Sequence, residues 1–190
     1  NPFVKIINDG LNGWLTTMSG SSAVLLGLLL GGMMAVDMGG PVNKAAYVFG
    51  TGTLATTITR GGSAAMAAVM AGGMVPPIAI ALSTTLFKNK FTKEEKDAGL
   101  SNYVMGLSFI TEGAIPYAAS DPTRVIPANI VGSAIAGALT MLFGIKIPAP
   151  HGGILVMFLS NNFVMYFIAI VIGAVVSALL LGILKKKISE

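Results

Sequence analysis

The sequence predicts an all-α membrane protein, a polytopic bundle of transmembrane helices that contains two re-entrant helical hairpins. Of its 190 residues, 54% are hydrophobic and 11% are charged, and the mean hydropathy is +0.79. Soluble domains carry about 25% charged residues, and a disordered chain is far more polar than this one. The charged residues are clustered, and the apolar stretches between clusters approach the roughly 20 residues that cross a bilayer as a helix.

An interfacial amphipathic helix is expected over residues 1–18. Apolar residues recur there at helical spacing, while Lys5 and Asp9 lie on the opposite face. Packing of the apolar face against the rest of the bundle explains the pattern equally well. The chain begins without an initiator Met or a signal-peptide pattern, so we expect a fragment or a processed piece of a longer protein.

Four apolar stretches predict membrane spans, at residues 19–36, 64–87, 125–144 and 154–184. The first contains a Gly-x-x-x-Gly spacing that starts at Gly27, which we attribute to ordinary small-residue packing. Two adjacent prolines are expected to interrupt the second span. Two adjacent asparagines are expected to break the fourth.

The basic residues set the expected orientation. Seven of the 12 Lys and Arg residues lie in the loop near 88–98 or in the run Lys185-Lys186-Lys187, so we expect this loop and the carboxy terminus to be cytoplasmic. An even number of crossings must then separate them, and the last two spans already supply two. The segment 99–120 is therefore predicted to be re-entrant. Its Glu, Gly and Pro residues suit broken backbone that is buried in protein.

A second re-entrant hairpin is predicted near residues 39–62, where charged residues and helix breakers bound an apolar centre. A short true crossing is the alternative. Two interrupted segments flanked by complete spans are typical of a transporter binding site, in which half-helix ends present backbone groups to the substrate. Residues 19–190 are accordingly predicted to form one substrate-binding transport domain.

Ionisable residues inside a membrane are functional candidates by default. Glu112 is the strongest, because it lies in the 99–120 segment without a basic residue within several positions. Mutual pairing or helix capping explains Asp37 and Lys44 as well as a ligand role does, and Asp121, which precedes a proline, resembles a helix N-cap. Carboxylates, amides and hydroxyls in such a set are the groups that bind a sugar.

Composition excludes several other kinds of site. The chain has no cysteine and a single histidine, which excludes disulfides, thiolate ligands and the familiar histidine metal sites. No metal or cofactor is expected. The net charge of +4 comes from clustered lysines, so we do not expect nucleic-acid binding.

Three motifs carry a resemblance to a known family: Asp37-Met-Gly-Gly-Pro-Val-Asn-Lys-Ala-Ala-Tyr47, Ser108-Phe-Ile-Thr-Glu-Gly-Ala-Ile-Pro-Tyr117 and Pro148-Ala-Pro-His-Gly-Gly153. With them, the chain resembles the membrane component, enzyme IIC, of the fructose family of the bacterial phosphoenolpyruvate-dependent sugar phosphotransferase system. The match extends over roughly residues 27 to 160. The family's membrane component is longer, so the chain resembles its carboxy-terminal, substrate-binding half.

The resemblance implies group translocation across the bacterial inner membrane. The membrane component binds fructose or a related hexose, and a phosphocysteine on a partner IIB domain, itself supplied through HPr and IIA, phosphorylates the sugar. The chain is then the permease component of a protein-phosphohistidine-sugar phosphotransferase. It has no cysteine that could donate a phosphoryl group. A homodimer is implied for the full-length protein.

The resemblance also implies the residues of a site. Glu112 would hydrogen-bond the hydroxyl that accepts phosphate and take its proton, Asn43 would bind other hydroxyls, and Lys44 would help to neutralise the phosphate. The other implied substrate contacts are Thr111, Gly113 and His151, with Asp37, Arg60 and Asp121 as supporting residues.

Two other classes of protein fit the sequence. In an ion-coupled secondary transporter for a small polar solute, Glu112 or Asp37 would titrate or bind a cation. In a non-transporting membrane scaffold, the small-residue faces and buried polar pairs would serve packing alone.

Overall fold

The protein is all-helical in the part that the structure describes. The computed structural model describes residues 22–188, together with the isolated positions 2, 5, 6, 9, 10 and 13. The interfacial helix expected over residues 1–18 lies outside the continuous described part. The helices are α2 (Ala23–Val36), α3 (Pro41–Thr57), α4 (Ala64–Leu86), α5 (Lys93–Gly99), α6 (Ser101–Leu107), α7 (Ile115–Ser120), α8 (Pro122–Leu142), α9 (Ile154–Met157) and α10 (Phe163–Leu184), with 3₁₀ turns η1 (Ile58–Arg60), η2 (Lys88–Lys90) and η3 (Thr111–Ala114).

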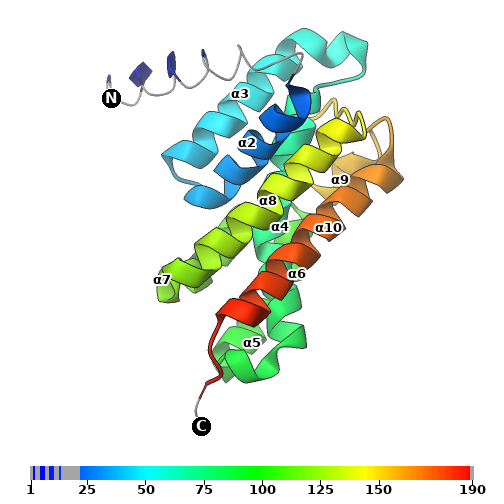
Figure 1. The fold of residues 1–190 in the computed structure, drawn as a ribbon. Coiled ribbons are helices and arrows are strands. Elements are labelled where there is room, and N and C mark those ends of the chain that lie inside the picture. The colour runs from blue at the N-terminus through cyan, green and yellow to red at the C-terminus, as the bar shows by residue number, and fades with distance from the viewer. Residues whose placement is uncertain (1, 3–4, 7–8, 11–12, 14–21, 189–190) are drawn as a thin grey trace.

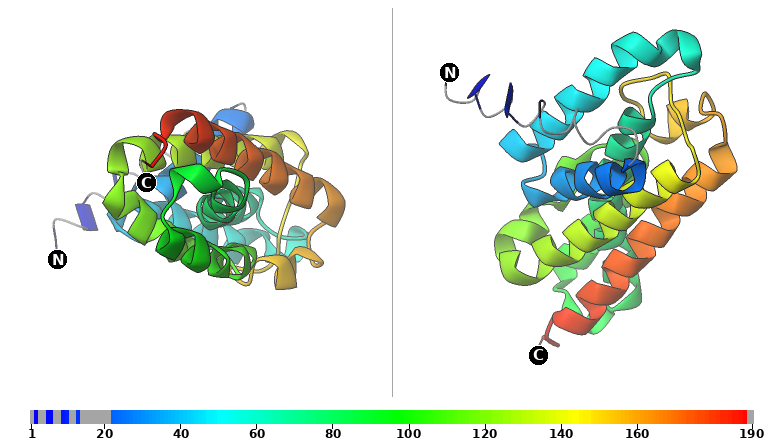
Figure 2. Two further views of the ribbon diagram at one scale, coloured as in Figure 1. Left: turned by 90° about the horizontal axis from the view of Figure 1, so that it is seen from below. Right: turned by 45° about the horizontal axis from the view of Figure 1, so that its top comes forward.

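Helix α4 is the centre of the bundle, and the other helices surround it when the molecule is seen end-on (Figure 2). Its sequence is rich in Ala, Gly and Met, and almost all of it is buried against α2, α8, α10 and α6. Small residues let the surrounding backbones approach α4 closely. Helices α8 and α10 run side by side across one face of the molecule and leave apolar side chains on their outer surfaces (Figure 1).

Three helices in the described part are long and apolar enough to cross a membrane, namely α4, α8 and α10. They confirm the spans predicted at 64–87 and 125–144 and the second part of the span predicted at 154–184. The span predicted at 19–36 is shorter in the structure, because α2 has 14 residues within the described part. Within the described residues, the structure therefore supports a polytopic membrane protein with three long apolar helices, where the sequence suggested four spans.

The two expected interruptions have different outcomes. Helix α4 continues through Pro76 and Pro77, so the predicted interruption of this span is wrong. The break near Asn161 is confirmed. Asn161 accepts a hydrogen bond from the Lys146 amide at 2.8 Å, and Asn162 caps α10 by accepting one from the Met165 amide at 3.2 Å.

The hairpin predicted near residues 39–62 is wrong in its position. Residues 41–57 form one uninterrupted helix, α3, which packs beside α2. The helical hairpin of this region consists instead of α2 and α3, joined by the turn Asp37–Gly40. Pro41 starts α3 because a proline at the first helical position loses no intrahelical hydrogen bond.

The segment 99–120 is broken in its middle. Helix α6 ends at Leu107, and the chain turns through Ser108 and Ile110 before η3 and α7 begin. The break confirms that this segment is not a simple span. Its re-entry into a membrane remains a prediction.

Candidate functional site

Three segments that are distant in the sequence meet at one cavity of about 210 Å³. They are the amino-terminal part of α3 with the preceding turn, the break before η3, and the loop before α9. The cavity contains most of the residues predicted for the site. Its lining residues are Met34, Gly39, Asn43, Lys44, Tyr47, Phe109, Thr111, Glu112 and His151.

Asp37 fixes the α3 side of the cavity. Its carboxylate accepts hydrogen bonds from the amides of Val42 at 2.8 Å and Asn43 at 2.9 Å, so it caps the amino terminus of α3. It forms no ion pair with Lys44 in the described part of the chain, which decides between the two structural alternatives for this carboxylate. Asp37 therefore holds the turn and does not line the cavity.

Asn43 and Lys44 reach the cavity from the first turn of α3. The Asn43 side chain is buried, and its Nδ2 donates to the Met34 carbonyl at 2.8 Å. This bond orients the amide and commits one of its donors. Lys44 is exposed and lines the same cavity. The two residues thus offer an oriented amide and a mobile cation to a ligand.

Glu112 lies over the turn that precedes α3. Gly39 has a φ of +102°, and a Cβ at this position would lie 3.0 Å from Glu112 Oε1. The absent side chain therefore lets the carboxylate approach the turn, while the left-handed backbone favours glycine. Among the described residues, no ion pair or hydrogen bond involves the Glu112 carboxylate, although Glu112 lines the cavity together with Lys44 and His151. It is available to a ligand.

Thr111 is tied to α4 by a carbonyl that a proline leaves free. Pro77 has no amide hydrogen, so the carbonyl of Gly73, four residues earlier, cannot form its usual helical bond. The Thr111 hydroxyl donates to that carbonyl at 2.7 Å, and both groups are buried. Thr111 lines the cavity, but its hydroxyl hydrogen is committed to α4. Its main effect is to position Glu112.

Replacing Thr111 by Val is expected to destabilise the protein by about 1–2 kcal/mol, because the Gly73 carbonyl is left buried without a donor. The free energy of unfolding in detergent micelles measures this effect. Thr56→Val is a matched control, since Thr56 is exposed and its hydroxyl bonds only within α3. An unchanged stability of Thr111→Val would mean that the bond to α4 contributes nothing.

Aromatic rings form one wall of the cavity. Phe109 has a left-handed backbone, with φ of +63°, and its buried ring lies 4.8 Å from the ring of His151 and 6.3 Å from that of Tyr47. A Cβ at Gly73 would lie 2.1 Å from the Phe109 ring, so this glycine of α4 makes room for the ring. Aromatic faces of this kind pack against the carbon atoms of a ligand.

Four residues that line the cavity are absent from the predicted site, namely Met34, Gly39, Tyr47 and Phe109. Tyr47 lies four positions after Asn43 on one face of α3, so this spacing is a signal that could have found it. Met34 carried no such signal, because it belongs to a uniformly apolar helix. Its carbonyl matters more than its side chain, as the partner of the Asn43 amide.

The other predicted residues lie outside this cavity. Gly113 lines a second cavity of about 390 Å³, which also contains Glu94, Glu95 and Glu112. Arg60 is exposed at the end of η1 and lines neither cavity. Glu112 is therefore the residue that both cavities share.

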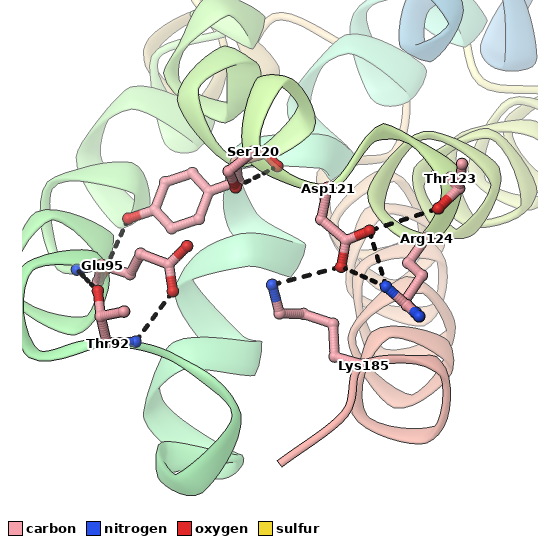
Figure 3. Close-up of polar contacts among 8 residues, drawn as sticks. Thr92, Glu95, Ser120, Asp121, Thr123, Arg124 and Lys185 are labelled. Carbon is pink, nitrogen blue, oxygen red and sulfur yellow. Dashed lines mark hydrogen bonds and ion pairs between the residues drawn. The ribbon is translucent and has the colours of Figure 1, made fainter. Parts of the chain in front are cut away.

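Asp121 belongs to an ion-pair cluster at the end of the bundle (Figure 3). It occupies the N-cap position of α8, as predicted, but its carboxylate caps no backbone amide in the described part. It pairs instead with Arg124 at 3.2 Å and with Lys185 at 3.7 Å. The Lys185 ammonium also lies 4.7 Å from the centre of the Phe91 ring. This cluster ties the start of α8 to the end of α10.

Removing the acidic residue of this cluster is expected to lower the stability of the protein more than removing Lys185. Asp121→Asn leaves the nearly buried Lys185 without a counter-ion, whereas Lys185→Met leaves Asp121 paired with Arg124. We expect a loss of about 1–2 kcal/mol for Asp121→Asn and a smaller loss for Lys185→Met. Thermal unfolding of the two single variants and the double variant checks this. Equal and additive losses would contradict it.

The fold and the cavity define a helical membrane protein with a small polar site built from broken helices. Residues 1–132 match the family described as "Phosphotransferase system, EIIC", and the chain belongs to this family. The family assignment confirms the resemblance seen in the three motifs.

Proteins similar to this chain are named for fructose. It is 55% identical over 190 residues to the "PTS system fructose-specific EIIABC component" of Bacillus subtilis (strain 168), covering 100% of this chain and 29% of that protein. It is 53% identical over 190 residues to the "Fructose permease IIC component" of Bacillus amyloliquefaciens, covering 100% and 61%. The "PTS system fructose-specific EIIC component" of Haloferax volcanii is 50% identical over 183 residues, covering 96% and 48%.

The chain spans less than two thirds of the length of these relatives. No solved structure matches it.

Proposed function

We propose that the cavity of about 210 Å³ binds fructose and that the chain is the sugar-binding part of a phosphotransferase-system permease. The observation that carries the proposal is the convergence of Asn43, Lys44, Glu112 and His151 from three distant segments on this one cavity. The family and the printed names of the relatives supply the sugar and the coupling to phosphorylation. The cavity is smaller than the sites of drug-sized ligands, which suits a monosaccharide.

The lining groups suit the recognition of a polyol. The carboxylate of Glu112 accepts hydrogen bonds from hydroxyls, while the ammonium of Lys44 donates them. The rings of Phe109 and Tyr47 supply an apolar wall for the carbon skeleton. We assign orientation of the site to Asp37 and Thr111, because the bonds they form are to the protein itself.

The chemical step follows from the position of Glu112. The sugar hydroxyl attacks the phosphorus of the phosphocysteine on the IIB domain, forming an O–P bond as the S–P bond breaks. The hydroxyl proton passes to the Glu112 carboxylate, and the cysteine leaves as a thiolate. Lys44 lines the same cavity, where its charge can balance that of the transferred phosphoryl group. The chain supplies the sugar site and the base, and the partner domain supplies the phosphoryl donor.

The arrangement in the membrane is part of the proposal. Residues 19–190 form the transport domain, the 99–120 segment re-enters the bilayer, and the basic loop near 88–98 faces the cytoplasm with the carboxy terminus. The full-length protein is a homodimer of the bacterial inner membrane that works with a IIB domain, supplied through HPr and IIA; fused IIB and IIC parts in the names of relatives support this partner.

The test is the coupling of fructose uptake to a phosphorylated partner. Vesicles containing the full-length protein are given labelled fructose with phosphorylated or unphosphorylated IIB. We expect fructose phosphate inside the vesicles only with phosphorylated IIB, and no change when proton and sodium gradients are dissipated. Unmodified fructose that accumulates under a gradient, without IIB, would instead identify an ion-coupled transporter.

A further inference from the structure

A basic cleft of about 530 Å³ lies at the end of the bundle, separate from the sugar cavity. Its cationic lining residues are Lys88, Lys93 and Lys96, and none of its lining residues is acidic. The other residues that line it are Asn89, Phe91, Thr92 and Ile188. The cleft is thus a local concentration of positive charge with an apolar floor.

Backbone contacts hold the two sides of the cleft together. The amide of Ile188 donates to the Asn89 carbonyl at 3.0 Å, and the Lys90 ammonium donates to the Gly182 carbonyl. These bonds join Gly182 of α10 and Ile188, which follows α10, to the loop after α4. The loop that carries Lys88 is therefore held against the end of α10.

The lysines of the cleft have no anionic partner within the described residues. The ion pairs found there involve Asp121 with Arg124 and Lys185. Of the carboxylates beside them in the sequence, Glu95 accepts a hydrogen bond from the Thr92 amide at 2.9 Å, Glu94 lines the second cavity, and Asp97 is exposed. Three lysines that form no ion pair within residues 22–188 therefore share one cleft, which suits an anion.

The cleft lies where two membrane spans end. Helix α4 ends at Leu86 and α10 at Leu184, and α5 lies at the same end of the molecule as the carboxy terminus (Figure 1). Leu86, Leu184 and Ile188 expose apolar side chains there. Headgroup phosphates of a bilayer lie at the level where spanning helices end. We propose that this cleft binds the phosphate of an anionic phospholipid, with the acyl chains against the exposed apolar side chains.

A lipid accounts for the surroundings better than a soluble anion does. A free phosphate would use the three lysines and leave the apolar side chains uncovered. An acidic protein surface would need the cleft to stand clear of the headgroups, but the helix ends place it at their level. Lysines near a membrane surface each strengthen the binding of anionic lipid about fivefold.

The experiment measures lipid selectivity at the surface of the full-length protein. It is reconstituted in phosphatidylcholine bilayers containing spin-labelled phosphatidylglycerol or spin-labelled phosphatidylcholine. Electron paramagnetic resonance gives the association constant of each immobilised lipid. We expect a preference for phosphatidylglycerol of about fivefold or more in the natural protein. The variant K88Q/K93Q/K96Q should lower this ratio to near unity.

Two further variants keep the test decisive. K88Q/K93Q retains the half-buried Lys96 and should lower the ratio partly, so a folding defect of the triple variant does not end the test. K146Q removes an exposed lysine outside the cleft and should leave the ratio unchanged. Fructose binding by each variant serves as the check of folding, so failure here is distinguishable from failure of the proposed sugar site.

Three results would overturn the proposal. The first is a ratio that is the same in the natural protein and the triple variant. The second is binding of inorganic phosphate that the triple variant abolishes, without any preference for phosphatidylglycerol in the natural protein, which would assign the cleft to a soluble phosphate. The third is retained lipid selectivity together with lost phosphoryl transfer from IIB, which would assign the cleft to the partner protein.

Discussion

Glu112→Gln is expected to lower the rate of phosphoryl transfer to fructose by roughly 10²–10⁴-fold, the usual contribution of a general base. The amide has nearly the same shape as the carboxylate and still forms hydrogen bonds, but it cannot take the hydroxyl proton. Fructose affinity should fall by no more than about tenfold, corresponding to the loss of one hydrogen bond. Transfer from phosphorylated IIB at saturating fructose gives the rate, and calorimetry gives the affinity.

The matched control for this prediction is Glu94→Gln. Glu94 lines the second cavity, which Glu112 shares, but it does not line the cavity that contains Lys44 and His151. It should leave both the rate and the affinity near their natural values. Natural rates of transfer in Glu112→Gln would remove Glu112 from the chemical step. An affinity loss much larger than the rate loss would make it a binding residue only.

Gly31→Ala is expected to destabilise the protein by about 3 kcal/mol, at the upper end of the range for overpacking. A Cβ at Gly31 would lie 2.2 Å from the Ser133 carbonyl oxygen and 3.1 Å from the Gly137 Cα, and both are backbone atoms of α8. Helices α2 and α8 would have to separate. Since α2 leads into the turn that carries Gly39, the cavity lined by Gly39 and Glu112 should also change its shape. Unfolding in detergent micelles and fructose binding measure the two effects.

Gly32→Ala provides the adjacent control. A Cβ at Gly32 would meet only side-chain atoms, the nearest at 3.6 Å, which is an ordinary van der Waals contact. This variant should be as stable as the natural protein or slightly more stable, because alanine favours helix. Equal losses at the two positions would mean that the contact of residue 31 with the α8 backbone does not decide the outcome.

Much of the fold was predictable because composition and length alone identify long apolar helices. The Gly-x-x-x-Gly spacing of Gly27 and Gly31 was correctly attributed to packing, since both glycines of α2 lie against the backbone of Gly137 in α8. The error near residues 39–62 arose from interpreting the charged residues and helix breakers of this segment as the limits of a hairpin. Gly40-Pro41 starts a helix, and Thr53 and Thr57 remain helical by bonding their hydroxyls to earlier carbonyls at 2.8 and 2.7 Å.

The site was predictable in its residues but less so in its geometry. Motifs located Asn43, Lys44 and Glu112, and the structure places them on one cavity. The partner of Thr111 was not predictable, because a carbonyl has no signature in the sequence. Asp121 shows the same limit: its local pattern predicts a cap, but its partner Lys185 belongs to the far end of the chain.

The free carbonyl of Gly73 has a consequence for how this protein can vary. The Gly73 carbonyl can accept a hydrogen bond from Thr111 because Pro77 has no amide hydrogen to occupy it. Residue 77 therefore influences the position of Thr111 through this carbonyl. Any other residue at 77 would supply an amide hydrogen that competes with the Thr111 hydroxyl for one acceptor. Substitutions at 77 and 111 should therefore be tolerated together more readily than singly. Proline normally weakens a helix, but here it leaves α4 with a buried carbonyl that binds one specific side chain of another segment.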